Sequence, residues 1–137
     1  MVLIPVTLPD SSEVHITAGG QNALIKQIME EFYTSCIPCG TLIYIGDAGN
    51  KFGLYNKDYA ACLGIIVNEH GKMPDVIVHL ETKNSLFLIE AVTSYGSIDI
   101  KRHNELKGLF RGVSLNPIFV TVFSFWKVMM KSLHNIV

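Results

Sequence analysis

The sequence predicts an α/β fold in which a mixed β-sheet lies between helices. Three observations support this prediction: an amphipathic helical segment near the N-terminus, four apolar strand-like runs, and a second helical segment between the last two runs. Their order is typical of a layered α/β domain. The chain has 137 residues, of which 49% are hydrophobic, and this is enough for one domain with a buried core.

The helices are indicated by apolar spacing and by breaker residues. The first spans about residues 21–33, and its apolar side chains recur at the spacing of one buried face: Ile25, Ile28, Met29 and Phe32. Pro38 and Gly40 stop this helix from continuing. A short helix is predicted at residues 57–63 and a longer one at residues 99–110.

Runs rich in β-branched and aromatic residues predict four strands: residues 41–45, 75–80, 86–92 and 118–123. The second and third can form a hairpin, with residues 81–84 as its loop. The fourth is apolar on both faces, so we expect it inside the sheet rather than at its edge. All four are expected to be neighbours in one sheet.

Charge and cysteine content restrict the function classes. The net charge is −1, which favours no nucleic-acid partner but does not exclude a nuclease, because a nuclease also needs carboxylates to hold a metal. Three cysteines, an odd number, argue against a disulfide framework and for a reducing, cytoplasmic compartment. The N-terminus lacks the pattern of a secretory signal, and the apolar stretch at 117–130 is too short for a comfortable membrane span.

Two carboxylates stand out in the predicted hairpin. Asp75 follows Pro74 at the start of the second strand, and Glu90 interrupts the apolar third strand. A carboxylate inside an apolar strand is costly unless it has a partner such as a metal. If the strands pair, both carboxylates lie near one end of the sheet, where they could hold Mg²⁺ for phosphodiester hydrolysis. The simpler alternative is a turn Asp and a solvent-facing Glu.

Several segments together resemble the BsuBI/PstI family of type II restriction endonucleases. They are YIGDAGNK at 44–51, GKMPDV at 71–76, LFLIEAVTSYG at 86–96, and the pair Lys101-Arg102. The resemblance covers roughly residues 21–122. It implies the PD-(D/E)XK nuclease fold, and with it Mg²⁺-dependent hydrolysis of double-stranded DNA in a restriction–modification system.

By this resemblance, Asp75 matches the aspartate of the PD-(D/E)XK motif and Glu90 its second acidic residue. The lysine of the motif is replaced by Val92. The positive charge must then come from elsewhere or be absent. Lys101 is the first candidate catalytic cation, ahead of Lys72 and Arg102, although a solvated lysine in the first turn of a helix would look the same in sequence.

Two further acidic residues are candidates for the same site. Glu31 on the first helix is a candidate third metal ligand, with a solvent-facing glutamate as the simpler interpretation. Asp47 ends the first strand within a segment that matches the family. It either orders the turn or contributes to the site.

The resemblance also divides the chain into three parts: an N-terminal segment at 1–20, the nuclease core at 21–123, and a tail at 124–137 that departs from the family. We therefore expect part of a restriction enzyme, with weak or no sequence-specific cleavage of its own, and a homodimer is a possible assembly. The rival hypotheses are an inactive remnant, a junction-resolving or repair nuclease, and a thiol oxidoreductase built on Cys36 and Cys39.

Overall fold

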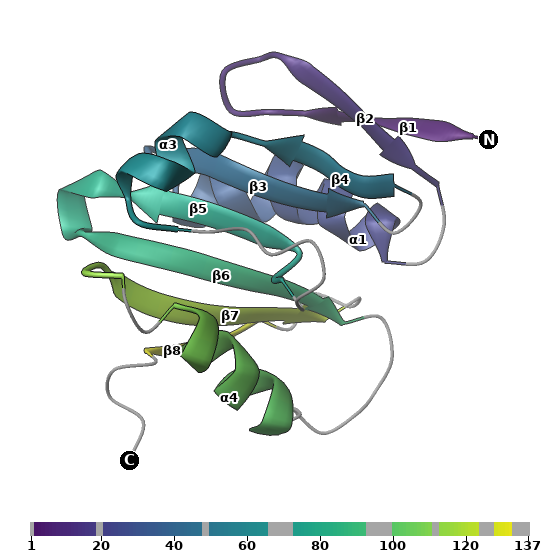
Figure 1. Cartoon of the computed structure of the whole chain (residues 1–137). Coiled ribbons are helices and arrows are strands. Elements are labelled where there is room, and N and C mark those ends of the chain that lie inside the picture. The colour runs from purple at the N-terminus through teal and green to yellow at the C-terminus, as the bar shows by residue number, and fades with distance from the viewer. Residues whose placement is uncertain are drawn as a thin grey trace.

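The computed structural model describes residues 2–18, 21–47, 50–65, 73–92, 100–110, 113–123 and 128–132. Its strands are β1 (Leu3–Thr7), β2 (Glu13–Thr17), β3 (Thr41–Asp47), β4 (Asn50–Tyr55), β5 (Val76–Leu80), β6 (Ser85–Val92), β7 (Asn116–Phe123) and β8 (Val128–Ser132). Within these residues, β3 to β8 form a six-stranded sheet in the order β4-β3-β5-β6-β7-β8, while β1 and β2 form a separate hairpin (Figure 1).

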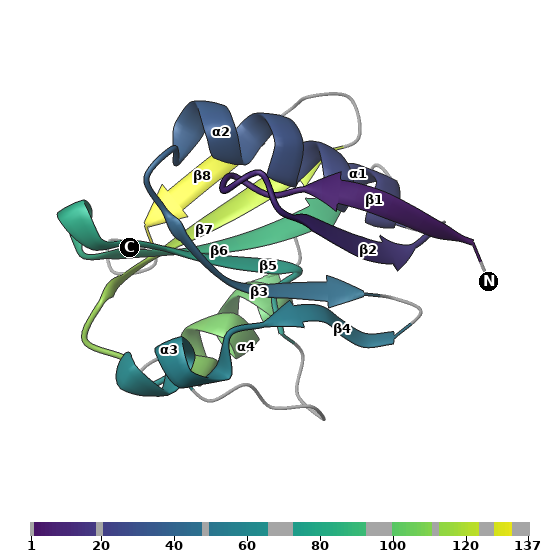
Figure 2. The same ribbon diagram turned by 90° about the horizontal axis from the view of Figure 1, so that it is seen from above.

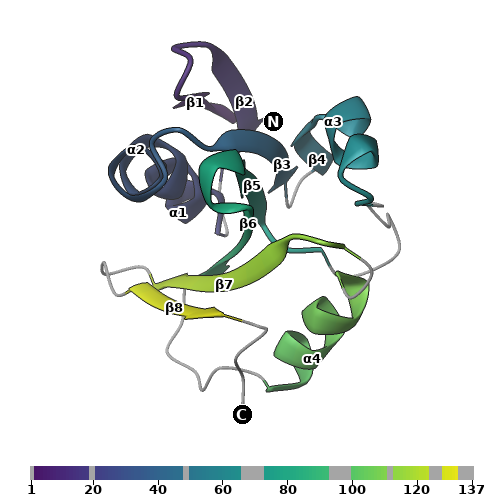
Figure 3. The same cartoon turned by 90° about the vertical axis from the view of Figure 1, so that its left-hand side faces the viewer.

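The helices form a layer on each face of the sheet. Three helical segments follow one another without a break: α1 (Asn22–Gln27), the π-helix η1 (Ile28–Phe32) and α2 (Tyr33–Cys36). They lie on one face, whereas α3 (Lys57–Cys62) and α4 (Ile100–Leu109) lie on the other, as Figures 2 and 3 show. A 3₁₀ turn, η2 (Glu81–Lys83), joins β5 to β6. No helix in the described ranges is long and apolar enough to cross a membrane.

The sheet is mixed because β6 and β7 run parallel, whereas the other neighbouring strands run antiparallel. A parallel pair needs a crossover connection, and here the connection carries α4. β7 lies between β6 and β8, which confirms the internal position predicted from its apolar faces. The four predicted strands are confirmed as the consecutive neighbours β3, β5, β6 and β7.

The prediction missed four strands. β1 and β2 lie in the segment at 1–20, β8 lies in the predicted tail, and β4 follows the turn expected after residue 45. Each is an edge strand or part of the two-stranded hairpin, and strands in such places generally need no continuous apolar run. The first helix also extends to Cys36, beyond the predicted end at residue 33.

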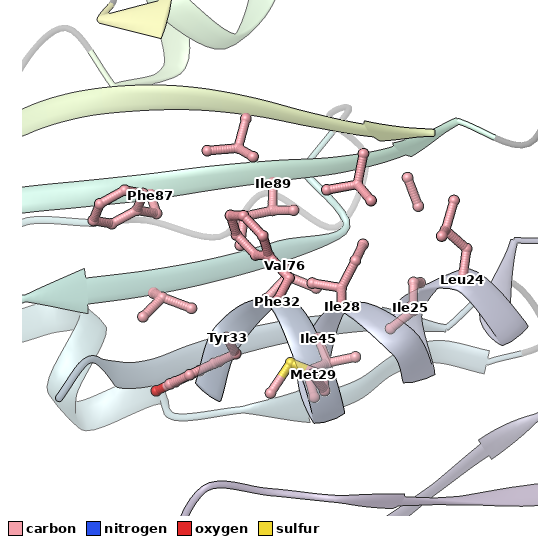
Figure 4. Packing of buried hydrophobic residues seen from close by; sticks show 14 of the residues in the cluster. Leu24, Ile25, Ile28, Met29, Phe32, Tyr33, Ile45, Val76, Phe87 and Ile89 are labelled. Carbon is pink, nitrogen blue, oxygen red and sulfur yellow. The ribbon is translucent and has the colours of Figure 1, made fainter. Parts of the chain in front are cut away.

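The face under α1, η1 and α2 carries a continuous apolar core. Alternate strand residues point into it, as the pleat of a strand requires, and they include Val76, Val78, Phe87, Ile89 and Ala91. Figure 4 shows the helix side chains of the same cluster, among them Ile25, Ile28, Met29 and Phe32. The π-helix brings both Met29 and Phe32 into this core, where they are almost fully buried.

A second core fills the opposite face. There Ile77, Leu86, Leu88 and Phe119 of the strands pack in one cluster with Leu106 and Phe110 from the region of α4. The buried positions of Leu106 and Phe110 confirm the core-facing side predicted for this helix. The side chain of Leu109, the third residue expected there, lies outside the described residues.

The β1–β2 hairpin is fastened to the first helix by polar contacts. Lys26 Nζ donates a hydrogen bond to the carbonyl of Pro5 at 2.6 Å, and it also forms an ion pair with Glu30 at 2.9 Å. The backbone N–H of Thr7 donates to the same Glu30 carboxylate at 2.9 Å. These hydrogen bonds, first from Lys26 and then from Thr7, lower the pKa of Glu30. Val6 and Ile16 of the hairpin are fully buried against the core.

Candidate active site

The register of β5 and β6 places the two predicted carboxylates beside each other. Val76 pairs with Ile89 in this antiparallel ladder, so one step further brings Asp75 opposite Glu90. Glu90 follows Leu88 by two residues and therefore shares its face, the one covered by α4. Directly opposite residues in an antiparallel pair have Cβ atoms about 5 Å apart. Glu90 therefore lies on the face covered by α4, and Asp75, which immediately precedes β5, lies beside it at the same end of the sheet.

Asp75 is held from three separate elements. Gln21, at the start of the first helix, donates from Nε2 to Asp75 Oδ1 at 2.5 Å. The backbone N–H of Ala91 on β6 donates to Asp75 Oδ2 at 2.8 Å. The carbonyl of Asp75 accepts a hydrogen bond of 2.7 Å from the N–H of Gly46 on β3. The protein itself therefore holds the Asp75 carboxylate in position, without a bound ligand.

Tyr44 of β3 lies next to this group. It pairs with Ile77 across the ladder and packs edge-on against Tyr55, with ring centroids 6.2 Å apart. Burial raises the pKa of the Tyr44 phenol, and the negative charge of Asp75 raises it further. The phenol therefore stays protonated at neutral pH and remains a hydrogen-bond donor near the carboxylates. Tyr44 belongs to a segment that resembles the family, but no role was predicted for it.

The candidate cations are only partly described. Val92 is half-buried and lies on the same face as Glu90, so this position supplies no charge where the motif has a lysine. Lys101 lies in the first turn of α4, the helix that covers this face, but its side chain is outside the described residues. The side chains of Arg102 and Asp47, and the whole of Lys72, are also outside them.

The structure does not bring Glu31 to Asp75. Glu31 is exposed on η1, ten positions after Gln21, which corresponds to roughly 15 Å along a helix. The helix residue that does contact Asp75 is Gln21, and sequence reasoning missed it. The two residues are 54 positions apart, and no spacing or motif links them.

The donor set consists of oxygen atoms, which suit hard cations such as Mg²⁺, Ca²⁺ and Mn²⁺. No group of three or more His, Cys, Asp and Glu side chains gathers in the part of the chain that the structure describes. Asp75 and Glu90 offer carboxylate oxygens alone. Mg²⁺ is commonly held by one or two carboxylates together with water and substrate phosphate, whereas structural zinc needs four nitrogen or sulfur ligands.

The fold around this carboxylate pair is that of a restriction endonuclease-like domain. The structure is similar to that described as "Structure of SdaI restriction endonuclease", with a TM-score of 0.76 and 36% sequence identity, over 88% of this chain and 38% of that chain. This similarity confirms the predicted fold class, a mixed sheet flanked by helices in a PD-(D/E)XK-like arrangement.

Sequence comparison identifies the family. The BsuBI/PstI restriction endonuclease domain matches residues 4–137, so the chain belongs to this family, as the resemblance predicted. It is 44% identical to the type II restriction enzyme BsuBI of Bacillus subtilis over 97% of this chain and 42% of that protein. It is 28% identical to the type II restriction enzyme AplI of Arthrospira platensis over 89% of this chain and 40% of that protein.

The chain spans about two fifths of the length of these relatives. The family match also extends over residues 4–20 and 124–137, beyond the nuclease core predicted at 21–123. The division into three segments stays a prediction. Within the described residues, however, both flanking segments contribute strands, namely the β1–β2 hairpin and β8.

Proposed function

We propose that this chain is the catalytic part of a type II restriction endonuclease that hydrolyses phosphodiester bonds of double-stranded DNA in a restriction–modification system. The observation that carries the proposal is the β5–β6 register, which, continued by one residue beyond the pair Val76–Ile89, sets Asp75 beside Glu90 at one end of the sheet. Membership of the BsuBI/PstI family supports the same reaction.

In this proposal, Asp75 and Glu90 hold Mg²⁺ through their carboxylate oxygens. The cation would supply Lewis-acid polarisation of the phosphoryl oxygen and a more acidic attacking water. The protein holds the Asp75 carboxylate with hydrogen bonds from Gln21 and Ala91, so that little reorganisation is needed when the site is filled. Tyr44, which stays protonated, lies at the same end of the sheet, where the negative charge of Asp75 helps to raise its pKa.

Lys101 is the proposed source of positive charge that stabilises the transition state. Lys101 lies in the first turn of α4, and this helix packs on the face that carries Glu90 through Leu106 and Phe110, which supports the role. Glu31 was the third predicted metal ligand. Its exposed position away from Asp75 gives that role no support, and we leave it out of the proposed site.

An inactive remnant of such an enzyme is the second candidate. The observation that favours it is Val92 in place of the motif lysine. If no cation replaces this lysine, the site would bind Mg²⁺ without efficient cleavage. Metal binding and cleavage therefore have to be measured separately.

The proposed partner is double-stranded DNA, with a homodimer as the proposed assembly because enzymes that read symmetric sites commonly act as two-fold dimers. The proposed location is the cytoplasm, in accordance with the odd number of cysteines.

Sequence-specific recognition normally needs about 1,000 Å² or more of protein surface. A chain two fifths as long as its relatives should therefore show weak or no sequence-specific cleavage alone.

The test is a calorimetric Mg²⁺ titration followed by incubation with plasmid DNA. The parent chain should bind Mg²⁺, and both Asp75→Asn and Glu90→Gln should abolish binding. Any cleavage should fall by roughly 10³-fold or more, because a metal contributes several kcal/mol to the barrier and each 1.4 kcal/mol corresponds to about tenfold in rate. Lys101→Ala should slow cleavage without changing the affinity for Mg²⁺.

Glu81→Gln is the matched control, since Glu81 is exposed at the opposite end of β5. It should bind and cleave like the parent chain. Mg²⁺ binding with an intact plasmid would support the inactive remnant. Equal Mg²⁺ binding by the parent chain and Asp75→Asn would overturn the proposed site.

A further inference from the structure

Gln21 connects the first helix to the carboxylate that we propose as a metal ligand. Its Nε2 atom lies 2.5 Å from Asp75 Oδ1 in a half-buried setting, across 54 positions of sequence. Gln21 itself is held by the helix, because its carbonyl accepts a hydrogen bond of 3.0 Å from the N–H of Ile25. Ile25 is fully buried in the core. The carboxamide therefore projects from a rigid base rather than from a free loop.

Gln21 and Ala91 donate to different oxygens of Asp75. Gln21 binds Oδ1, and the N–H of Ala91 binds Oδ2 at 2.8 Å. Rotation of a carboxylate about its last bond is otherwise broad, so two donors from different elements set the orientation of the whole group. The Ala91 N–H belongs to the peptide bond that follows Glu90. This second contact thus ties Asp75 to the strand that carries the other carboxylate.

Hydrogen bonding and metal ligation can coexist on one carboxylate, which accepts about four contacts in total. Carboxylates that bind metals are themselves commonly hydrogen-bonded, and loss of such a partner typically weakens metal affinity by about 10- to 100-fold. A carboxamide suits this task because it donates without adding charge. A lysine at the same place would neutralise Asp75 and repel the cation.

We propose that Gln21 is a positioning residue that holds Asp75 in the orientation needed for binding a divalent cation. This inference rests on the proposed function, in which Asp75 and Glu90 hold that cation. The first helix would then contribute to the site through Gln21, which positions a ligand, rather than through Glu31 as a third metal ligand.

The experiment measures Mg²⁺ affinity by calorimetry on the whole chain without DNA, together with the melting temperature in EDTA. Gln21→Met keeps the size of the side chain but removes the donor, and it should weaken binding by about 10- to 100-fold. Saturating Mg²⁺ should restore the parental stoichiometry. Gln21→Lys should bind more weakly still, because of its charge. The matched control is Gln27→Met, at an exposed position near the end of α1, and it should bind as the parent does.

Three outcomes distinguish the role of Gln21 from the proposed metal site of Asp75 and Glu90. If Gln21→Met binds Mg²⁺ as tightly as the parent or more tightly, while Asp75→Asn does not bind, only the role of Gln21 is overturned. If the parent and Asp75→Asn bind equally, the proposed metal site itself fails. If Gln21→Lys binds as well as the parent, the need for a neutral donor is refuted. Should Gln21→Met melt much earlier in EDTA, Gln21→Asn provides the same readout with a polar side chain that is one methylene too short.

Discussion

The two faces of the central sheet are built from the same strands but differ in what their side chains do. On the face covered by the first helix, Val76, Val78, Phe87, Ile89 and Ala91 all belong to one apolar core. The opposite face also has an apolar centre, but it carries polar side chains on the same two strands. These are His79 and Glu90, and Asp75 immediately precedes β5 at the end of the sheet where Glu90 lies.

The second face accepts polar groups at a cost. His79 is 5% exposed, and its Nδ1 atom is 2.7 Å from the hydroxyl of Tyr59. Its Nε2 atom is buried without a hydrogen-bond partner in the part of the chain that the structure describes. A buried polar atom left without a partner generally costs about 1–3 kcal/mol. The difference teaches that one face is packed with apolar side chains from both strands, whereas the other combines an apolar core with polar groups.

The largest expected effect comes from neighbouring residues that point to opposite faces. Ile89→Ala should lower the free energy of unfolding by about 2–5 kcal/mol, because it leaves a cavity in the helix-covered core. Glu90→Gln, one residue along, should change it by about 1 kcal/mol or less. Urea denaturation of both variants measures the contrast. Similar losses in the two variants would contradict the contrast between a core side chain and its polar neighbour on the other face.

The second-largest expected effect is stabilisation by Mg²⁺, which we propose binds to one face of the sheet only. If the second face holds Mg²⁺, then Mg²⁺ at 100 times its dissociation constant should stabilise the fold by about 2.7 kcal/mol. Removal of the metal with EDTA should reverse this gain. Asp75→Asn should not respond to Mg²⁺, whereas Ile89→Ala should gain as much as the parent chain. Thermal denaturation with and without Mg²⁺ is the measurement, and a gain in Asp75→Asn would contradict the comparison.

A pair of glycines tests how tightly each region is packed. A Cβ atom added at Gly40 would lie 2.5 Å from Val78 Cγ1, on the helix-covered face. Gly40→Ala should therefore cost about 1–3 kcal/mol through overpacking. At Gly46, beside Asp75, the nearest atom to an added Cβ would be the Tyr44 hydroxyl oxygen at 3.4 Å, an ordinary contact. Gly46→Ala should cost much less, and equal losses in urea denaturation would disprove the difference in packing.

The smallest effect concerns a charge that only fastens the hairpin. Hydrogen bonds from Lys26 and Thr7 lower the Glu30 pKa below its ordinary value of 4.5. The ionised carboxylate therefore adds stability above pH 4.5, and this contribution disappears as the pH falls through the lowered pKa of the folded state. Glu30→Gln should cost about 1 kcal/mol at pH 7, since the group is partly exposed.

The control for this prediction is the same comparison of the parent chain and Glu30→Gln at low pH. In strong acid, where Glu30 is protonated, the parent chain and Glu30→Gln should have nearly equal stability. Denaturation curves from pH 2 to 7 would show whether the two converge. A difference that does not depend on pH would mean that the carboxylate charge has no part in docking the hairpin.

The sequence alone determined the central strands and the neighbourhood of the two carboxylates. β-Branched and aromatic runs separated by turn residues specified β3, β5, β6 and β7, all of which the structure confirms. Asp75 and Glu90 could be placed at one end of the sheet because a short hairpin fixes its register locally and side chains alternate between faces. Their role as metal ligands remains a proposal that the resemblance to the family supports.

Only the tertiary structure decided which other groups reach that end of the sheet. The edge strands β4 and β8 have weak patterns of their own, and they are strands because a neighbouring strand pairs with them. Gln21 approaches Asp75, and Glu31 does not, because of the way the first helix packs across the sheet through Ile25, Ile28 and Phe32. Periodicity identifies the buried side of a helix. The position of the helix along the sheet depends on how well side chains that are far apart in sequence pack together.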